Sequence, residues 1–155
     1  MVDDAWAANW PGQVTVVGDG AALFGELEGG QPMELSWAQQ SDVACFPGTQ
    51  NDAYEGPHVL FAMQQEAERF IDIRVHPEAG VDLSIFSIQQ ATNSFVLPPD
   101  TETAVACEAA LMAGAGEPEA LSLWKSSNPY NVVIGVAGVA DQPRGRFLLE
   151  ITSSQ

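Results

Sequence analysis

Apolar and polar residues alternate with a period of two along much of the chain. In the segment 70–76 the side chains of Ile71, Ile73 and Val75 fall on one face, and charged or polar side chains fall on the other. The same alternation runs through 146–152. It is typical of β-strands with one buried face, and the β-branched and aromatic residues that strands prefer are enriched in these runs. The pattern therefore predicts an all-β protein.

Turn-forming residues such as Gly18-Asp19-Gly20 separate short candidate strands along the chain. Short, regularly spaced strands are typical of a sandwich or barrel. We expect a jelly-roll-like antiparallel β-sandwich of about 8–10 strands, as a single domain over residues 13–155 after an N-terminal arm or linker over residues 1–12. The candidate strands lie near 13–17, 22–27, 32–37, 57–63, 68–76, 81–89, 93–97, 103–107, 119–124, 130–137 and 145–152.

The composition fits a folded protein with an unusual charge balance. Hydrophobic residues make up 46% of the chain, which argues against disorder. Asp and Glu number 21 against 5 Lys and Arg, a formal net charge of -16. Because phosphate backbones and anionic lipids need a cationic surface, we expect no nucleic-acid partner and no anionic membrane partner. The acidity serves solubility or supplies carboxylates for a divalent cation.

We expect neither a membrane span nor a signal peptide in this sequence. No stretch approaches the about 20 apolar residues of a transmembrane helix, so membrane insertion is not expected. The start, Met1-Val2-Asp3-Asp4, lacks the basic and apolar regions of a signal peptide. These features fit a cytosolic protein, a mature form with an added Met, or a virion component made in the cytoplasm.

The sequence contains no recognisable catalytic constellation, and we expect that the protein is not an enzyme. There is no Gly-x-Ser-x-Gly motif, and His58 and His76 both lie in strand-like segments. His76 precedes Pro77 on a polar face, where an exposed strand-end residue is commoner than a general base.

Two cysteines, Cys45 and Cys107, bear on the cellular compartment. They form no Cys-x-x-Cys motif, and a zinc site would need four ligands at short spacings. Neither has the basic neighbour that activates a catalytic thiol. They form either one disulfide, which would point to an oxidising compartment, or a pair of buried free thiols.

Calcium is the best candidate for a cofactor, although none is certain. The loop 49–56 supplies Asn51, Asp52 and Glu55, whose oxygens are the ligands that calcium prefers, and Gly56 lets the backbone bend. No EF-hand spacing is present. The alternative is a solvated polar loop.

Two aromatic residues are candidates for ligand binding. Trp124 ends a candidate strand next to Lys125, and Tyr130 opens the next strand. Their rings could form a stacking platform at one end of the sandwich. The alternative is core or rim packing, because large aromatic side chains usually bury most of their surface.

Five short motifs follow one another from Cys45 onward: YEGPHVLF at 54–61, FIDIRVHP at 70–77, GVDLSIF at 80–86, YNVVIGVAG at 130–138 and GRFLLEI at 145–151. Their order and spacing resemble those of the bacterial pre-peptidase C-terminal (PPC) domains. Asp82 and Glu55-Gly56 match positions of the family pattern, whereas Gly135-Val136 stands where the family often has Asp.

The resemblance implies a jelly-roll-like sandwich on a secreted bacterial protein, often beside a peptidase. Related collagen-binding modules use the same sandwich, some with calcium near the N-terminal linker. The pair Cys45 and Cys107 also looks like the disulfide of some members.

Two functions are therefore expected. The first is a non-catalytic accessory or adhesion module of a secreted, periplasmic or cell-surface bacterial protein, which presents the sandwich to a protein or polysaccharide surface. The second is a structural or spike component of a virion or surface appendage. That component would dock a neighbour, or a second copy of itself, through residues 1–12.

Overall fold

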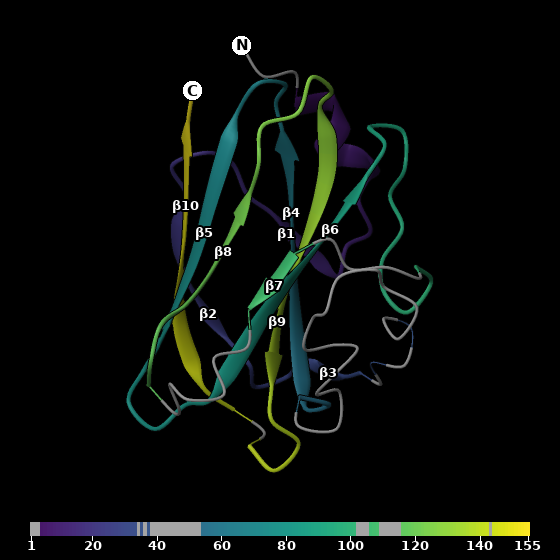
Figure 1. Cartoon of the computed structure of the whole chain (residues 1–155). Helices are drawn as coiled ribbons and strands as arrows, with labels where there is room; N and C mark the ends of the chain where they lie inside the picture. Colours follow the sequence, from purple (N-terminus) through teal and green to yellow (C-terminus); the bar gives the residue numbers. More distant parts are fainter. Residues whose placement is uncertain are drawn as a thin grey trace.

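A computed structural model of the chain describes residues 4–33, 35, 37, 54–101, 106–108, 116–142 and 144–155. The chain forms an all-β sandwich of two sheets, which confirms the predicted fold class (Figure 1). A 3-10 helix, η1 (Asp4–Asn9), precedes the strands. No helix in the described part of the chain is long and apolar enough to cross a membrane.

The described strands are β1 (Val14–Val16), β2 (Ala22–Glu26), β3 (Gln31–Pro32), β4 (Pro57–Gln65), β5 (Phe70–Pro77), β6 (Leu83–Gln90), β7 (Ala106–Glu108), β8 (Glu119–Leu123), β9 (Tyr130–Gly138) and β10 (Arg146–Ser154). The larger sheet has the order β1-β4-β9-β6-β7, with β3 also paired to β4, and the smaller sheet has the order β2-β10-β5-β8. Without β1 and β3, these are the two four-stranded sheets of a jelly roll. β1 pairs with β4 in parallel, whereas the other described pairs are antiparallel.

The core lies between the two sheets and is built from the alternating apolar positions. Rings of Phe61 and Phe147 meet edge to face across it, with their centres 6.2 Å apart. Fully burying one large apolar side chain contributes roughly 1.5–3 kcal/mol, so this layer is the main source of stability. Its members that are at most 2% exposed include Phe61, Met63, Ile71, Ile73, Val75, Ile85, Val132, Ile134, Val136, Phe147, Leu149 and Ile151.

Two glycines let phenylalanine rings cross a neighbouring strand. Gly25 of β2 lies opposite Phe147 of β10, and Gly135 of β9 lies opposite Phe86 of β6. A Cβ atom at either glycine would lie 2.2 Å from the nearest atom of the facing ring. The rings cover the strand surface that the glycines leave bare. This packing gives a reason for Gly135, where the chain departs from the PPC pattern.

A second apolar layer covers the outer face of the larger sheet. Trp10 and Trp37 lie in it and are only 7% and 9% exposed. The ring centre of Trp37 is 5.4 Å from that of Phe86, and the ring centre of Trp10 is 5.0 Å from that of Phe95. Because both faces of β9 are covered, its residues from 131 to 138 are all buried.

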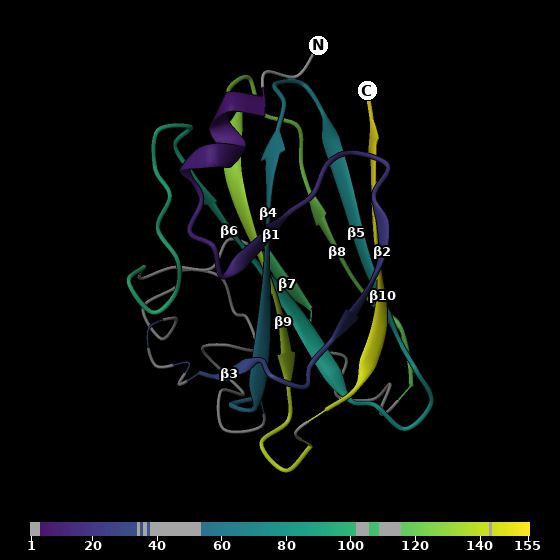
Figure 2. The same ribbon diagram turned by 180° about the vertical axis from the view of Figure 1, so that it is seen from behind.

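The segment expected to be an N-terminal arm packs on the domain from residue 4 onward. η1 lies beside the larger sheet, at the same end of the sandwich as the C-terminus (Figure 2). The rings of Trp6 and Trp10 meet edge to face with their centres 6.4 Å apart, and both contribute to the second apolar layer. The boundary at residue 12 stays a prediction.

One expected strand, 93–97, is wrong, because this segment is a loop. Side-chain amides make the hydrogen bonds that a neighbouring strand would otherwise supply. Gln90 bonds both the backbone N–H and the carbonyl of Val96, at 2.8 and 2.9 Å. The buried Asn131 side chain donates to two further carbonyls of the loop.

Two other expected strands are described only in part. Of the strand expected at 32–37, residue 32 lies in β3, residues 33, 35 and 37 lie outside any strand, and residues 34 and 36 are not described. Of the strand expected at 103–107, residues 106 and 107 lie in β7. Residues 102–105 and 109–115 lie outside the described residues.

Candidate binding face

The outer face of the smaller sheet is open to solvent, unlike that of the larger sheet. Alternate side chains of its strands point away from the core, and Arg74 and Arg146 on it are exposed. No segment among the described residues packs over this surface. Two large apolar side chains on it are also exposed, Phe24 at 81% and Trp124 at 78%. We call the outward side chains of β2, β10, β5 and β8, together with Trp124 directly after β8, the open face.

Strand register arranges the open face in rows that run across the strands. Leu148 of β10 lies opposite Phe24 of β2 on one side and opposite His76 of β5 on the other. Another row pairs Asp72 of β5 with Ser122 of β8. Successive rows lie about 7 Å apart, because a strand rises about 3.3 Å per residue and every second residue points outward.

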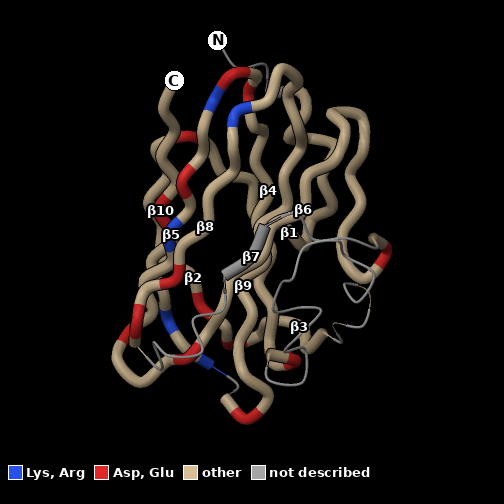
Figure 3. Tube along the Cα trace, viewed as in Figure 1, with Lys and Arg blue, Asp and Glu red and all other residues tan. Residues whose placement is uncertain are grey.

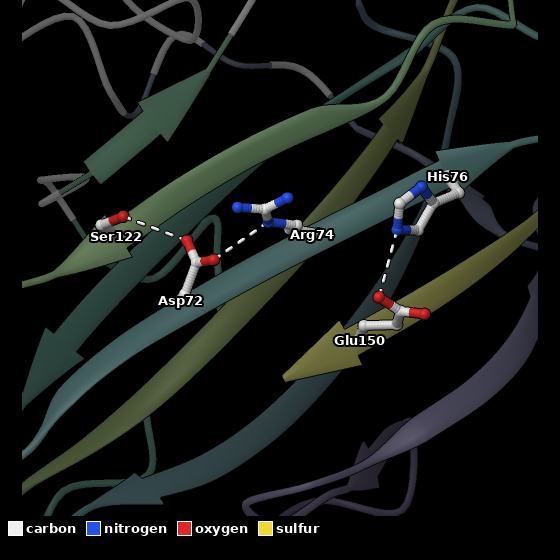
Figure 4. Close-up of polar contacts among 5 residues, drawn as sticks. All are labelled: Asp72, Arg74, His76, Ser122 and Glu150. Carbon is white, nitrogen blue, oxygen red and sulfur yellow. Dashed lines mark hydrogen bonds and ion pairs between the residues drawn. The ribbon is translucent and has the colours of Figure 1, made fainter. Parts of the chain in front are cut away.

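Polar contacts hold the charged side chains of the open face in place (Figure 4). The Nε of Arg74 donates to Asp72 at 3.0 Å, and the hydroxyl of Ser122 donates to the other oxygen of the same carboxylate at 3.2 Å. The Nε2 of His76 lies 3.3 Å from a carboxylate oxygen of Glu150. The carboxylate of Asp72 thus bridges the Ser122 hydroxyl of β8 and the Arg74 guanidinium of β5.

Glu26 joins the end of β2 to the start of β10. Its Oε1 accepts the backbone N–H groups of Glu28 at 3.0 Å and Gly145 at 2.7 Å. Its Oε2 lies 3.7 Å from the Nε of Arg146. These backbone hydrogen bonds, first that of Glu28, and the nearby guanidinium lower the pKa of Glu26 below its ordinary value, so this carboxylate stays charged.

All five cations of the chain belong to the smaller sheet or to the loops at its ends (Figure 3). Arg74 and Arg146 lie in β5 and β10, Arg69 precedes β5, Lys125 follows β8, and Arg144 precedes β10. Acidic residues occur on both sides of the molecule. The open face is thus the part of a strongly acidic molecule where charges of both signs are interspersed.

The two residues expected to bind a ligand lie near each other at one end of the sandwich. Trp124 and Tyr130 line one shallow hollow of about 290 Å³, together with Lys125. The ring of Trp124 contacts that of Phe70 edge to face, with the centres 5.5 Å apart. The carbonyl of Trp124 accepts a hydrogen bond from the buried Gln65 side chain at 3.0 Å, which fixes the strand end. Ligand binding by Trp124 and Tyr130 stays a prediction.

The expected calcium loop falls largely outside the described residues. Of its three candidate ligands only Glu55 is described, and it is half-buried. Among the described residues no group of three or more acidic, histidine or cysteine side chains could hold a metal ion. The calcium site at Asn51, Asp52 and Glu55 stays a prediction.

The expected disulfide also lies outside the described residues. Cys45 is not described, and Cys107 is described only as part of the backbone of β7. No disulfide is seen among the described residues, and the pairing of Cys45 with Cys107 stays a prediction.

Sequence reasoning missed Phe24, the most exposed large apolar side chain of the described residues. A signal was present, because Leu23 and Gly25 face the core in an alternating strand and Phe24 must then face outward. An outward phenylalanine beside an outward glutamate would have marked the surface of β2 as a candidate site.

Comparisons with known proteins give a likeness in structure. No protein-family model matches the chain, and no curated protein matches its sequence. The structure is similar to the pre-peptidase C-terminal domain of a collagenase from Bacillus anthracis, with a TM-score of 0.54 and 15% identity over 93% of this chain and 99% of that chain. A periplasmic inhibitor of g-type lysozyme from Aeromonas hydrophila aligns over 92% of this chain and 98% of its own, with a TM-score of 0.49 and 9% identity. The resemblance expected from the sequence is therefore confirmed at the level of the fold: this chain has the β-sandwich fold of a pre-peptidase C-terminal domain.

Proposed function

We propose that this chain is a non-catalytic accessory module of an extracytoplasmic bacterial protein, and that it binds a protein or polymer through the open face. The observation that carries the proposal is the contrast between the two outer faces. Trp10 and Trp37 bury the outer face of the larger sheet, whereas Phe24 and Trp124 stay exposed on the smaller one. Exposed aromatic side chains are the usual anchors of binding surfaces.

The fold and the N-terminal contacts support an accessory module over a virion or appendage component. The similar domain is named as part of a collagenase, and the alignment of the two structures covers 99% of that domain. Docking of a neighbour through residues 1–12 would use Trp6 and Trp10, which pack on their own domain instead.

The proposal is tested by retention of the purified chain on insoluble collagen, chitin and peptidoglycan, measured by sedimentation. We expect retention on at least one of these polymers, and loss of it in Phe24→Ser and Trp124→Ser. Val96→Ser is the matched control, because Val96 is 40% exposed but lies in the loop on the side of the larger sheet. Equal loss in all three variants, or retention unchanged in the two open-face variants, would contradict the proposal.

A further inference from the structure

A shallow pocket of about 580 Å³ lies at one corner of the open face. Its middle is the cross-strand row of Phe24, Leu148 and His76. The row toward the end of the sheet contains Arg146 opposite Glu26, beside Glu78. We call this site the Phe24 pocket, lined by Phe24, Glu26, His76, Glu78, Arg146 and Leu148.

The floor of the Phe24 pocket is apolar and accessible. Phe24 is 81% exposed and lies beside the half-buried Leu148. A phenylalanine ring left in water on a strand is unfavourable in the isolated domain, because burying its apolar surface would remove that surface from water. The ring face can also attract a cation that lies over it.

Carboxylates outnumber cations around this floor. Glu26 and Glu78 form one side, and Glu150 approaches from the next row through its contact with His76. Glu78 accepts the backbone N–H of Arg146 through Oε1, and among the described residues its Oε2 has no partner. Arg146 is the arginine in the lining of the pocket. Its side chain is 75% exposed, and its Nε lies 3.7 Å from Oε2 of Glu26. The lining thus has two carboxylates, one guanidinium and one imidazole, and the next row adds Glu150 opposite Arg74.

The charge of the whole molecule acts in the same direction. A formal net charge of -16 attracts basic partners and repels acidic ones over distances up to about a Debye length, about 8–10 Å. The local and the overall charge therefore both favour a cation at the Phe24 pocket.

We propose that the Phe24 pocket binds a lysine or arginine side chain of a basic partner protein, with the alkyl stem on Phe24 and Leu148 and the cationic head between Glu78 and Glu26. This inference rests on the proposed function and names the chemistry of the partner. The stem of a basic side chain is apolar and its head is charged, so the stem contacts the apolar floor and the head contacts the carboxylates. The entering cation competes with Arg146 for Glu26.

The test is a titration followed by backbone amide NMR shifts, with three probes that share one apolar body. These are 4-phenylbutylamine, 4-phenylbutanol and 4-phenylbutyrate. We expect the amine to bind roughly two- to fivefold more tightly than the alcohol, the range of an exposed ion pair, and the acid to bind most weakly. Equal binding of all three probes, tightest binding of the acid, or shifts that avoid β2 and β10 would overturn the proposal.

Variants of the full chain separate the contributions. We expect Phe24→Ser to abolish binding of the amine and Glu78→Gln to weaken it. We expect Arg146→Gln to strengthen it, because the competing guanidinium is removed; weaker binding of the amine in this variant would contradict the competition for Glu26 and overturn the proposal. Val96→Ser, which lies outside the open face, should bind the amine like the unaltered chain. If the amine fails to bind while polymer retention still depends on Trp124, the pocket inference is wrong and the proposed function stands.

Discussion

At the residue scale, two glycines of the sandwich lie directly against phenylalanine rings. Gly135 lies under the ring of Phe86, and a Cβ there would be 2.2 Å from the ring. Both residues lie in the fully buried part of the larger sheet. Such overpacking forces side chains or backbone to shift and is costly.

We expect Gly135→Ala to lower the free energy of unfolding by about 1–3 kcal/mol, measured by urea denaturation. Gly12→Ala is the matched control, because no atom lies within 4 Å of a Cβ at that position. The control should stay within about 0.5 kcal/mol of the unaltered chain. Equal stabilities of the two variants would contradict the packing described for β9.

His58 is a buried histidine with a defined tautomer. Its Nδ1 lies 2.8 Å from the carbonyl of Gly56 and donates to it, so the proton of the neutral ring is on Nδ1. Burial lowers the pKa of His58 below the ordinary value of 6.5, against a smaller opposing effect of the hydrogen bond. The native state therefore holds this side chain uncharged.

This burial predicts a pH-dependent stability. Below pH 6.5 the unfolded chain binds a proton at His58 that the native chain does not, so the free energy of unfolding decreases as the pH falls. The slope is at most about 1.4 kcal/mol per pH unit, and the effect vanishes above the unfolded pKa. Urea denaturation of the unaltered chain and of His58→Gln between pH 7.5 and 5 checks it. A slope as steep in the variant would remove His58 as the cause.

At the element scale, one glutamine side chain ties the two sheets together. Gln65 at the end of β4 is fully buried, and its Nε2 donates to the carbonyls of Arg69 and Trp124 on the side of the smaller sheet. Its Oε1 accepts a hydrogen bond from Gln89 of β6 at 2.6 Å. The start of β5 and the end of β8 are thus held by one amide.

Gln65→Met keeps the shape of this side chain but removes its hydrogen bonds. We expect a loss of about 1–3 kcal/mol in the free energy of unfolding, because buried partners are left unsatisfied. Gln64→Met is the matched control one residue earlier, where the side chain is half-buried. Thermal denaturation of the two variants compares them, and an equal change in both would contradict the role of Gln65.

The strands with regular alternation were predictable, and the loops were not. β5 and β10 follow from their alternating apolar positions, because one face of each is buried and the other is open. The expected strand 93–97 is wrong because its backbone partners are the side chains of Gln90 and Asn131, which no local pattern reveals. Phe24 was missed because its exposure depends on which surface the rest of the chain leaves uncovered.

At the scale of the whole molecule, the expected disulfide would close a loop of about 60 residues between the two cysteines and stabilise the fold by roughly 4 kcal/mol in the chain-entropy model. We expect peptide mapping under non-reducing conditions to recover Cys45 and Cys107 in one linked peptide pair. Recovery of both as free thiols would contradict the pairing and weaken the case for an oxidising compartment.

The arrangement of covered and open faces could not be predicted from the sequence. Trp10 belonged to the expected arm and Trp124 to an expected platform, and nothing in their surroundings along the chain distinguishes a buried indole from an exposed one. The exposures of the two indoles differ because η1 and the loops that carry the second apolar layer fold over the larger sheet, whereas β8, which Trp124 follows, lies at an edge of the smaller sheet. The proposed function depends on this asymmetry.

The reactivity of the four tryptophans tests this asymmetry most directly. Brief oxidation of the native chain by hydroxyl radicals, followed by mass spectrometry, measures the rate at each indole. We expect Trp124, at 78% exposure, to react fastest, and Trp10 and Trp37, at 7% and 9%, to be protected. Trp10 and Trp37 reacting as fast as Trp124 would contradict the covered face, and protection of Trp124 would contradict the open one.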